Sequence, residues 1–211
     1  MDTSYIEQVV EDSIRAVSTL KEPDALVFIQ QSARMLSDSL LAGNKVIAIG
    51  NGGSLCDATH FAEELTGFFR SKRPALPAIV LNEAGHLTCV ANDIGYEFVF
   101  SRGVEAYGKP GDVLIALSTS GKSPSIINAV ETATKLGLNT ISLLGKGGGP
   151  LKGKSDLELI IDGFSTSDRI QEAHMAALHI IIELIEYNLF SNNELASAQK
   201  ILGRTDVLPL S

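Results

Sequence analysis

The chain contains the stretch Val46-Ile47-Ala48-Ile49-Gly50-Asn51-Gly52-Gly53-Ser54, followed by the helix-compatible residues 56–64. A short β-branched run, a glycine turn and a helical segment, in this order, predict the strand, loop and helix of an α/β unit. Glycines let the backbone approach a ligand closely, and the N–H groups at the start of a helix face it with a partial positive charge. The turn therefore predicts a seat for a phosphate group or a sugar hydroxyl. Its spacing matches neither a dinucleotide-binding fingerprint nor a P-loop.

One turn into the predicted helix, His60 and Glu64 are four positions apart and so share a helix face. An imidazole and a carboxylate beside a phosphate-sized seat favour chemistry on a small phosphorylated molecule. A pair with this spacing is also common on the solvated face of a helix, so further residues are needed to assign a function.

Strands and helices alternate outward from this unit. We expect strands at residues 45–49, 78–81, 113–117, 140–144 and 157–161, and helices at 4–20, 24–41, around 60–64, 97–106, 124–136 and from the capping residues 166–168 to 190. Residues 92–95 are expected in a loop or short helix, and residues 145–149 in a mobile loop. This order predicts an α/β fold with a mainly parallel sheet and an N-terminal helical arm.

Length and composition predict one globular domain. Its 211 residues are 45% hydrophobic and 20% charged, an ordinary balance for a folded protein. We divide the domain into N-terminal helices at 1–44, an α/β core with a final helix at 45–190, and a C-terminal extension at 191–211. The formal net charge of −8 argues against nucleic acid as the main ligand, while a small phosphorylated molecule remains possible because neutral donors and helix ends can hold it.

The remaining bulk features predict a cytoplasmic protein. Cys56 and Cys89 form no disulfide framework and are expected to be buried and reduced. We expect no signal peptide at the N-terminus, because acidic residues follow Met1 closely. Apolar runs such as 180–182 are too short to span a bilayer, so no membrane partner is expected.

A second informative stretch, Ser118-Thr119-Ser120-Gly121-Lys122-Ser123, follows a predicted strand and precedes a helix that starts with Pro124. Hydroxyls, backbone amides and the helix dipole together can hold a phosphate group without an arginine. The same residues could form an ordinary capped loop. Because the loops after parallel strands meet at one edge of the sheet, we expect this loop to lie beside residues 50–54.

The third stretch, residues 168–179, reads Asp-Arg-Ile-Gln-Glu-Ala-His-Met-Ala-Ala-Leu-His and opens an apolar helix that we expect to be buried nearly all round. Histidines on such a helix are usually hydrogen-bonded core residues, and His174, like His86, is expected to be structural. Gln171 and His179 are about 12 Å apart along a regular helix and point in different directions. They can serve one ligand only if their side chains converge or another subunit contributes.

Together these stretches resemble the phosphoheptose isomerases of the sugar-isomerase, or SIS, domain family. The matching segments are G-N-G-G-S at 50–54, H-F-A-E-E at 60–64, A-N-D at 91–93, S-T-S-G-x-S at 118–123 and D-R-I-Q-E-x-H-x-x-x-x-H at 168–179. Their order and spacing extend from about residue 4 to 190. The chain departs from the pattern at Leu55, where a small or polar residue is frequent, and in its extension at 191–211.

The resemblance implies a three-layer α-β-α sandwich around a five-stranded parallel sheet, assembled as a homotetramer with active sites at subunit interfaces. It implies one zinc ion per subunit, bound by His60, Glu64, Gln171 and His179; these donor types are compatible with zinc, although glutamine is an uncommon ligand. The residues that would bind the sugar phosphate are Asn51, Gly52, Gly53, Glu64, Asn92, Asp93, Ser118, Thr119, Ser120, Ser123 and Gln171, with Ser54 and Asp168 adjoining them.

The implied reaction is the isomerisation of sedoheptulose 7-phosphate to D-glycero-D-manno-heptose 7-phosphate, the first step of bacterial ADP- or GDP-heptose biosynthesis for lipopolysaccharide. A base must move a proton from C1 to C2 through an enediol while an acid protonates the carbonyl oxygen; Glu64 is the candidate base and His179 the candidate acid. A metal would polarise the carbonyl. A side chain bound to zinc cannot freely exchange protons, so the metal could instead position the substrate oxygens.

The alternative function is that of a non-catalytic SIS protein, similar to the one that binds the bacterial replication initiator. That relative keeps counterparts of His60, Gln171 and His174 but lacks those of Glu64 and His179. This chain has both residues, which favours an enzyme.

Overall fold

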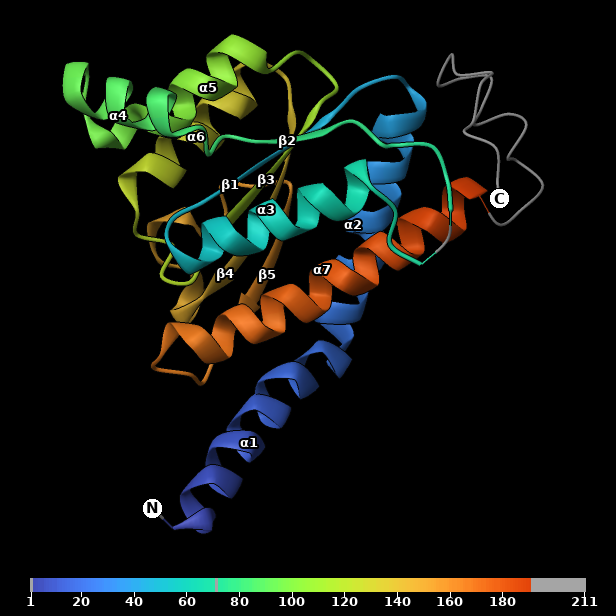
Figure 1. Ribbon diagram of the computed structural model, residues 1–211, viewed down its shortest axis with the longest axis vertical. Helices are drawn as coiled ribbons and strands as arrows, with labels where there is room; N and C mark the ends of the chain where they lie inside the picture. The colour runs from blue at the N-terminus through green and yellow to red at the C-terminus, as the bar shows by residue number, and fades with distance from the viewer. Residues whose placement is uncertain (1, 71, 191–211) are drawn as a thin grey trace.

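The computed structural model describes residues 2–70 and 72–190, and these residues form a five-stranded parallel sheet with helices on both faces (Figure 1). The strands are β1 (Val46–Gly50), β2 (Ala78–Val80), β3 (Val113–Ser118), β4 (Asn139–Gly145) and β5 (Leu157–Ile161). The helices are α1 (Thr3–Ser18), α2 (Pro23–Leu41), α3 (Gly53–Thr66), α4 (Ala84–Asp93), α5 (Val99–Tyr107), α6 (Pro124–Lys135) and α7 (Ser167–Phe190), with 3₁₀ turns η1 (Thr19–Lys21), η2 (Tyr96–Phe98) and η3 (Lys146–Leu151).

Alternate residues of the strands face two separate cores. Val113, Ile115 and Leu117 of β3 face the core that α2, α3 and α7 cover, while Leu114 and Ala116 face the core that α5 and α6 cover. Continuous apolar strands are typical of a parallel sheet that is buried on both faces. The predicted three-layer sandwich with a five-stranded parallel sheet is therefore confirmed.

The strands lie in the order β2-β1-β3-β4-β5, so the chain moves to one side of β1 to make β2 and to the other side to make β3. Gly50 at the end of β1 pairs in register with Leu117 near the end of β3. Ligands bind in open α/β folds where the strand order reverses, beyond the carboxyl ends of the strands. The fold therefore directs attention to the loops that follow β1 and β3.

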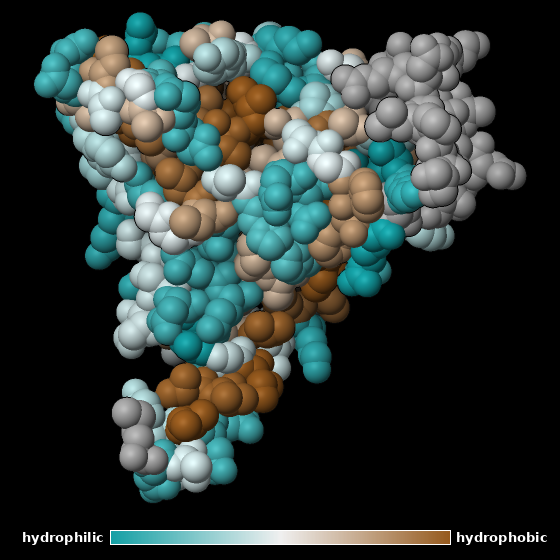
Figure 2. Space-filling model, in the orientation of Figure 1, coloured by the Kyte–Doolittle hydropathy of each residue, from teal (hydrophilic) through white to brown (hydrophobic). Residues whose placement is uncertain are grey.

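Helix α1 projects away from the sheet as the predicted arm (Figure 1). Of its residues only Ala16 is buried, and Figure 2 shows an apolar stripe along the arm. The exposed apolar side chains of α1 are Tyr5, Ile6, Val10, Ile14 and Val17. Helix α7 is also less buried than expected, because Ile180 and Tyr187 on its outer side are exposed.

Residues 92–95 were expected in a loop or short helix, and the structure shows a helix for the first two of them. Asn92 and Asp93 lie in the last turn of α4, which Glu83 caps by accepting hydrogen bonds from the N–H groups of Gly85 and His86 at 2.8 and 2.6 Å. Glutamate is outside the preferred set of N-cap residues, so the sequence did not indicate this helix clearly. The glycine segment after β4 forms the turn η3, whose backbone is non-helical with positive φ at Gly147, Gly148 and Gly149.

The prediction of buried cysteines is wrong, since Cys56 and Cys89 are both free and exposed. Cys56 lies on the side of α3 opposite the buried Ala58, Phe61 and Leu65, and helical periodicity therefore turns its thiol to solvent. Within the described ranges, no helix has the length and apolar character needed to cross a membrane. The predicted extension at 191–211 lies outside these ranges.

Candidate functional site

The glycine loop between β1 and α3 is held tightly against its own helix. A Cβ at Gly50 would collide with the backbone carbonyl of Ser54, and Gly52 has φ +56°, so glycine is needed at both positions. The N–H of Ser54 donates to the carbonyl of Asn51 at 3.1 Å. The predicted seat at the N-terminus of α3 is therefore formed as a compact turn.

Gly53 makes room for a side chain from the last helix. A Cβ at Gly53 would lie 2.5 Å from Nε2 of Gln171, and this Nε2 donates to Oγ of Ser54 at 3.3 Å. Gln171 thus lies against the glycine loop, about 12 Å along α7 from His179. The structure brings Gln171 to the predicted substrate residues Gly53 and Ser54, and no contact in the described chain joins it to His179.

The serine loop, defined here as residues 118–123, lies beside the glycine loop because β3 pairs with β1. Its Ser118 Oγ accepts from the N–H of Gly121 at 3.1 Å, and Ser120 Oγ accepts from the N–H of Lys122 at 3.3 Å. Thr119 Oγ1 lies 3.0 Å from Oγ of Ser167 at the start of α7. The loop is therefore braced by its own hydroxyls and tied to α7.

The serine loop packs on η3 without space for a side chain. Gly121 has φ +61°, and a Cβ there would overlap the carbonyl oxygen of Gly148. The carbonyl of Gly121 accepts from the N–H of Leu151 at 3.2 Å. The segment expected to be mobile therefore supports the candidate phosphate seat.

His60, Glu64 and His179 meet where α3 and α7 run side by side (Figure 1). His60 Nε2 lies 3.2 Å from Oε1 of Glu64 and 3.4 Å from Nε2 of His179. The His60 and Glu64 side chains remain 43% and 22% exposed, so a small molecule can reach the cluster. The two residues predicted to act as base and acid therefore both lie next to His60 within a single chain.

Burial lowers the pKa of His179 below the ordinary histidine value, and the positive charges of His60 and Arg70 act in the same direction, while Glu64 opposes them. The imidazole is therefore mainly neutral near pH 7. A neutral imidazole can donate a proton to a developing oxyanion and recover it, as an acid–base reaction on a sugar carbonyl requires.

A buried ion pair that sequence reasoning missed supports this cluster. Arg73 Nε donates to Oε1 of Glu186 at 2.7 Å, and the two side chains are only 1% and 7% exposed. Arg73 also donates to the backbone carbonyls of Glu64 at 2.7 Å and Leu65 at 2.9 Å, at the end of α3. The guanidinium therefore holds the helix end that carries Glu64. Its partner is far away in the sequence, and neither residue belongs to a motif, so no local pattern indicated the pair.

Two further acidic residues face the cluster. His60, Glu63 and Glu64 place one possible ligand atom each within 4.8 Å of one another. Asp57, one turn before His60, is half-buried, and its Oδ2 has no hydrogen-bond partner in the described chain. Burial raises the pKa of Asp57 to about 6, opposed by the nearby His60. The spacing of positions 53, 57, 60 and 64 on one helix face was a signal that could have identified Asp57.

Three other predicted site residues, Asn92, Asp93 and Asp168, are exposed. Asn92 donates to Oδ1 of Asp93 at 2.7 Å, and the thiol of Cys89 donates to Oδ2 of Asp93 at 3.5 Å. Asp168 is exposed in the first turn of α7, where a hydrogen bond from Thr166 lowers the pKa of its carboxyl group. The contacts of these side chains are with residues near them in sequence and do not join them to His60 or Glu64.

His174 and His86 have the structural roles that were predicted. The fully buried His174 places Nε2 2.9 Å from the carbonyl oxygen of Leu144, and His86 places Nε2 2.8 Å from the carbonyl oxygen of Val99. These rings link helices to neighbouring segments and are separate from the cluster of His60, Glu64 and His179.

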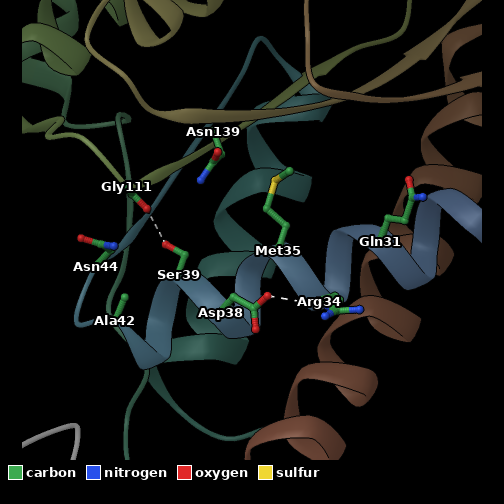
Figure 3. A pocket seen from close by; sticks show the side chains of 9 residues that line it. All are labelled: Gln31, Arg34, Met35, Asp38, Ser39, Ala42, Asn44, Gly111 and Asn139. Atoms are coloured by element: carbon green, nitrogen blue, oxygen red, sulfur yellow. Dashed lines mark hydrogen bonds and ion pairs between the residues drawn. The ribbon is translucent and has the colours of Figure 1, made fainter.

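Hollows occur at both ends of the sheet. One of about 520 Å³ borders the cluster and is lined by Leu55, Cys56, Thr59, His60, Glu63 and Asn82. Another of about 620 Å³ lies at the opposite end, beside the second half of α2 (Figure 3). There Ser39 donates to the carbonyl of Gly111, and the charged pair Arg34–Asp38 is exposed. That hollow contains none of the predicted site residues, so size alone does not mark the site.

Comparisons with known proteins place these features in a family context. The model of the SIS domain family matches residues 5–145. A phosphoheptose isomerase from Serratia proteamaculans is 56% identical over 158 residues, covering 75% of this chain and 82% of the relative. A phosphoheptose isomerase from Fusobacterium nucleatum is 56% identical over 164 residues, covering 78% of this chain and 84% of the relative.

Solved structures agree with this likeness. The phosphoheptose isomerase from Francisella tularensis superposes with a TM-score of 0.82 and 34% identity, over 88% of this chain and 98% of that chain. The phosphoheptose isomerase from Neisseria gonorrhoeae gives a TM-score of 0.80 and 34% identity, over 87% and 98% of the two chains.

Proposed function

The chain belongs to the SIS domain family, with the phosphoheptose isomerases as its relatives, and we infer that it isomerises sedoheptulose 7-phosphate to D-glycero-D-manno-heptose 7-phosphate. It is a phosphosugar aldose–ketose isomerase, and this reaction opens bacterial ADP- or GDP-heptose biosynthesis. The observation that carries the assignment is the meeting of His60, Glu64 and His179 on α3 and α7, the two helices whose first turns contact the glycine and serine loops.

Glu64 is the residue that we assign as base. The reaction removes a proton from C1 of the ketose and delivers a proton to C2, so one group must accept and return a proton over neighbouring carbons. Glu64 is supported from behind by the bond between its own carbonyl and Arg73. Its carboxylate lies in the partly exposed cluster, where the substrate can approach.

His179 is the residue that we assign as acid. Negative charge develops on the carbonyl oxygen as the enediol forms, and a neutral imidazole can protonate this oxygen and later take the proton back. The lowered pKa of His179 keeps the ring neutral. The stacked ring of Phe69, with its centroid 5.4 Å from that of His179, holds the imidazole in place.

The serine and glycine loops are the groups that we assign to the phosphate end of the sugar. Backbone amides at the starts of α3 and α6 and the hydroxyls of Ser118, Ser120 and Ser123 provide uncharged donors for an anion. Binding energy at this end positions the reacting carbons beside Glu64, which lowers the entropic part of the barrier.

We also propose one zinc ion per subunit at the cluster. Ligands bound tetrahedrally to one zinc ion are about 3.3–3.6 Å apart, and His60 Nε2 lies 3.2 and 3.4 Å from the Glu64 and His179 donors. The donor types of His60, Glu64 and His179 therefore suit zinc. The donors that already lie within 4.8 Å of one another are those of His60, Glu63 and Glu64, so the His179 ring would have to approach Glu64 to join them. Gln171 would have to leave Ser54 to become the fourth ligand. When bound, the ion would act as a Lewis acid on the substrate oxygens.

The zinc proposal is tested by metal content and not only by turnover. We expect about one zinc per subunit in the purified protein by elemental analysis, with loss of the metal in His60→Ala. Glu64→Gln separates the two roles of Glu64: a variant that keeps zinc but loses turnover assigns proton transfer to the carboxylate. A protein that binds no zinc at saturating metal would refute the proposed ion.

We propose a homotetramer with active sites near subunit interfaces. The apolar stripe of α1, defined here by Tyr5, Ile6, Val10, Ile14 and Val17, is exposed in the single chain, as are Ile180 and Tyr187 of α7. Contiguous exposed apolar surface of this kind is typical of a protein interface. Since α7 also carries Gln171 and His179, a subunit packed on it would lie close to the site.

The surroundings that we propose are cytoplasmic, with a small sugar phosphate as the only ligand class and no nucleic acid or membrane partner. Two free, exposed thiols suit a reducing compartment, and the net charge of −8 disfavours a phosphate backbone. The alternative of a non-catalytic SIS binding protein is not favoured, because Glu64 and His179 are both present and lie in one cluster.

The deciding experiment is a turnover assay with sedoheptulose 7-phosphate, carried out with and without a metal chelator. We expect formation of the heptose 7-phosphate, with activity reduced by the chelator and restored by zinc. The absence of product at saturating substrate and metal would exclude the isomerase. Activity that is unaffected by complete removal of the metal would exclude only the role of zinc.

A further inference from the structure

Tyr96 contacts the site through a residue of the glycine loop. Its hydroxyl donates to Oδ1 of Asn51 at 2.7 Å. On its other side, Nδ2 of Asn51 donates to Oγ of Ser125 at 3.0 Å. The Asn51 amide is therefore held between the phenol of η2 and a buried hydroxyl in the first turn of α6.

The backbone places Tyr96 at this point. Gly95 has φ +136°, a backbone conformation that residues with a Cβ rarely adopt, so a larger residue would strain the turn. Nδ2 of Asn128, on α6, donates to the carbonyl of Glu97 at 2.9 Å and fastens η2 to that helix. The phenol is thus presented over the first turn of α6 by a fixed support, although its side chain remains largely exposed to solvent.

A hollow lies beside the hydrogen-bonded side chains of Tyr96, Asn51 and Ser125. A hollow of about 410 Å³ is lined by Asn51, Tyr96, Glu97, Ser123, Pro124 and Ser125. Ser123, the N-cap residue of α6, makes no side-chain capping bond, so its hydroxyl is available to a ligand. Glu97 would repel an anion deep in the hollow, which favours a phosphate group at the Ser123 side, near the serine loop.

We propose that Tyr96 is a positioning residue for the phosphate seat of the sugar-phosphate substrate. Through Asn51 and Ser125 its hydroxyl fixes the separation between the glycine loop and the first turn of α6, which both contact the substrate in the proposed function. Loss of the hydroxyl frees the Asn51 side chain and loosens this separation. The effect falls on binding of the phosphate end and spares proton transfer at Glu64. The identity of the substrate rests on the proposed function. The hydrogen bonds that join Tyr96, Asn51 and Ser125 are observed independently of it.

The test is Tyr96→Phe, which keeps the ring and removes only the hydroxyl. Losing one hydrogen bond of ordinary strength is expected to raise KM for sedoheptulose 7-phosphate about fivefold, with kcat changed less than about twofold. The dissociation constant for inorganic phosphate, measured by calorimetry, is expected to rise by a similar factor. The matched control is Tyr107→Phe, because Tyr107 is 57% exposed compared with 55% for Tyr96 and lies at the end of α5, away from the seat.

A double variant shows whether both hydroxyls act through Asn51. Ser125→Ala is expected to raise KM as well, and combining it with Tyr96→Phe should add little, because the amide is already free. Unchanged KM and phosphate affinity in Tyr96→Phe, a loss in kcat alone, or fully additive effects would each overturn the proposal. If the wild type turned over no sedoheptulose 7-phosphate, the proposed function would fail, while phosphate binding would still decide the role of Tyr96.

Discussion

The ring of Phe69 stacks on the imidazole of His179, with centroids 5.4 Å apart and planes inclined by 20°. The backbone N–H of Phe69 donates to Oε1 of Glu186 at 3.1 Å, and that of Arg70 donates to Oε2 of the same carboxylate at 3.1 Å. Glu186 also binds Arg73, which holds the end of α3. One buried carboxylate on α7 thus supports the candidate acid through Phe69 and the candidate base through Arg73.

Glu186→Gln should destabilise the fold strongly. Removing the charge leaves the Arg73 guanidinium buried without its counter-ion, and breaking a buried pair in this way costs about 3–5 kcal/mol. Urea unfolding followed by circular dichroism measures the loss. Glu183→Gln is the control, because Glu183 pairs with Arg70 at the surface and such pairs contribute about 0–1 kcal/mol. Equal losses in the two variants would contradict the role given to the buried pair.

Glu64→Gln should abolish most turnover while the fold is kept. The amide preserves the shape of the side chain but cannot accept a proton, and loss of a general base lowers kcat by about 10²–10⁴-fold. Steady-state assays of the purified variant, with thermal unfolding as a check of the fold, give the result. Glu105→Gln, on α5 and away from the site, should behave as wild type. Retained turnover in Glu64→Gln would remove this residue from proton transfer.

Replacing both Ser118 and Ser120 by alanine should weaken substrate binding. The two hydroxyls brace the serine loop through Gly121 and Lys122, and they are proposed donors to the phosphate, so their loss should raise KM by about tenfold or more. The measurement is KM for the sugar phosphate. Thr134→Ala removes a hydroxyl at the far end of α6 and serves as control. An unchanged KM would exclude the loop from phosphate binding.

Introducing glutamate at Ile6 and Ile14 should dissociate the proposed tetramer. Both side chains belong to the apolar stripe of α1, and burying two unpaired carboxylates against another subunit is unfavourable. Light scattering should report a smaller species that is folded but poorly active. Gln8→Glu adds a charge on the polar side of the arm and should remain assembled. A fully active monomer would show that each chain holds a complete site.

Stability should depend on pH through His174. Burial lowers its pKa to about 4, so between pH 6.5 and 4 the unfolded chain takes up a proton that the folded chain does not. The free energy of unfolding therefore falls as pH falls through this window, by about 3 kcal/mol in all. Urea unfolding from pH 7 to 4.5 should show a flatter profile for His174→Gln than for wild type.

Asp57 should have the opposite effect on the pH dependence of the free energy of unfolding. The raised pKa of Asp57 lets the folded chain take up a proton first, which adds stability as pH falls below about 6. Asp57→Asn should therefore steepen the loss of stability in acid. Identical pH profiles for wild type and His174→Gln would show that His174 does not remain neutral in the folded chain.

The sheet was predictable because its strands are short continuous apolar runs between glycine or proline turns. All five predicted strands agree with the structure to within about two residues, as is usual for boundaries. The two loops could also be paired in advance, because parallel strands end at a common edge. What was missed locally was the first part of α4, since Glu83 is not among the preferred capping residues, and the turn at Lys146–Leu151, whose glycines resemble a flexible loop.

The candidate site was predictable only where chemistry lies in a motif. His60 and Glu64 share a helix face at regular spacing, so their pairing followed from the sequence. The approach of His179 to His60 depends on how α3 and α7 pack, and periodicity cannot supply it. Tyr96 and Arg73 were missed for a related reason, because each acts through a hydrogen bond to a residue in another element. A single tyrosine or arginine belongs to no sequence pattern from which such a partner could be predicted.

The contact between Gly121 and Gly148 means that the serine loop and η3 can change only together. No side chain fits between them, so an insertion or substitution in one segment has to be matched by the other. An engineer who transplants the serine loop to a new scaffold would have to carry residues 145–151 along with it, and a designer of altered substrate range has more freedom at Tyr96 than at either glycine.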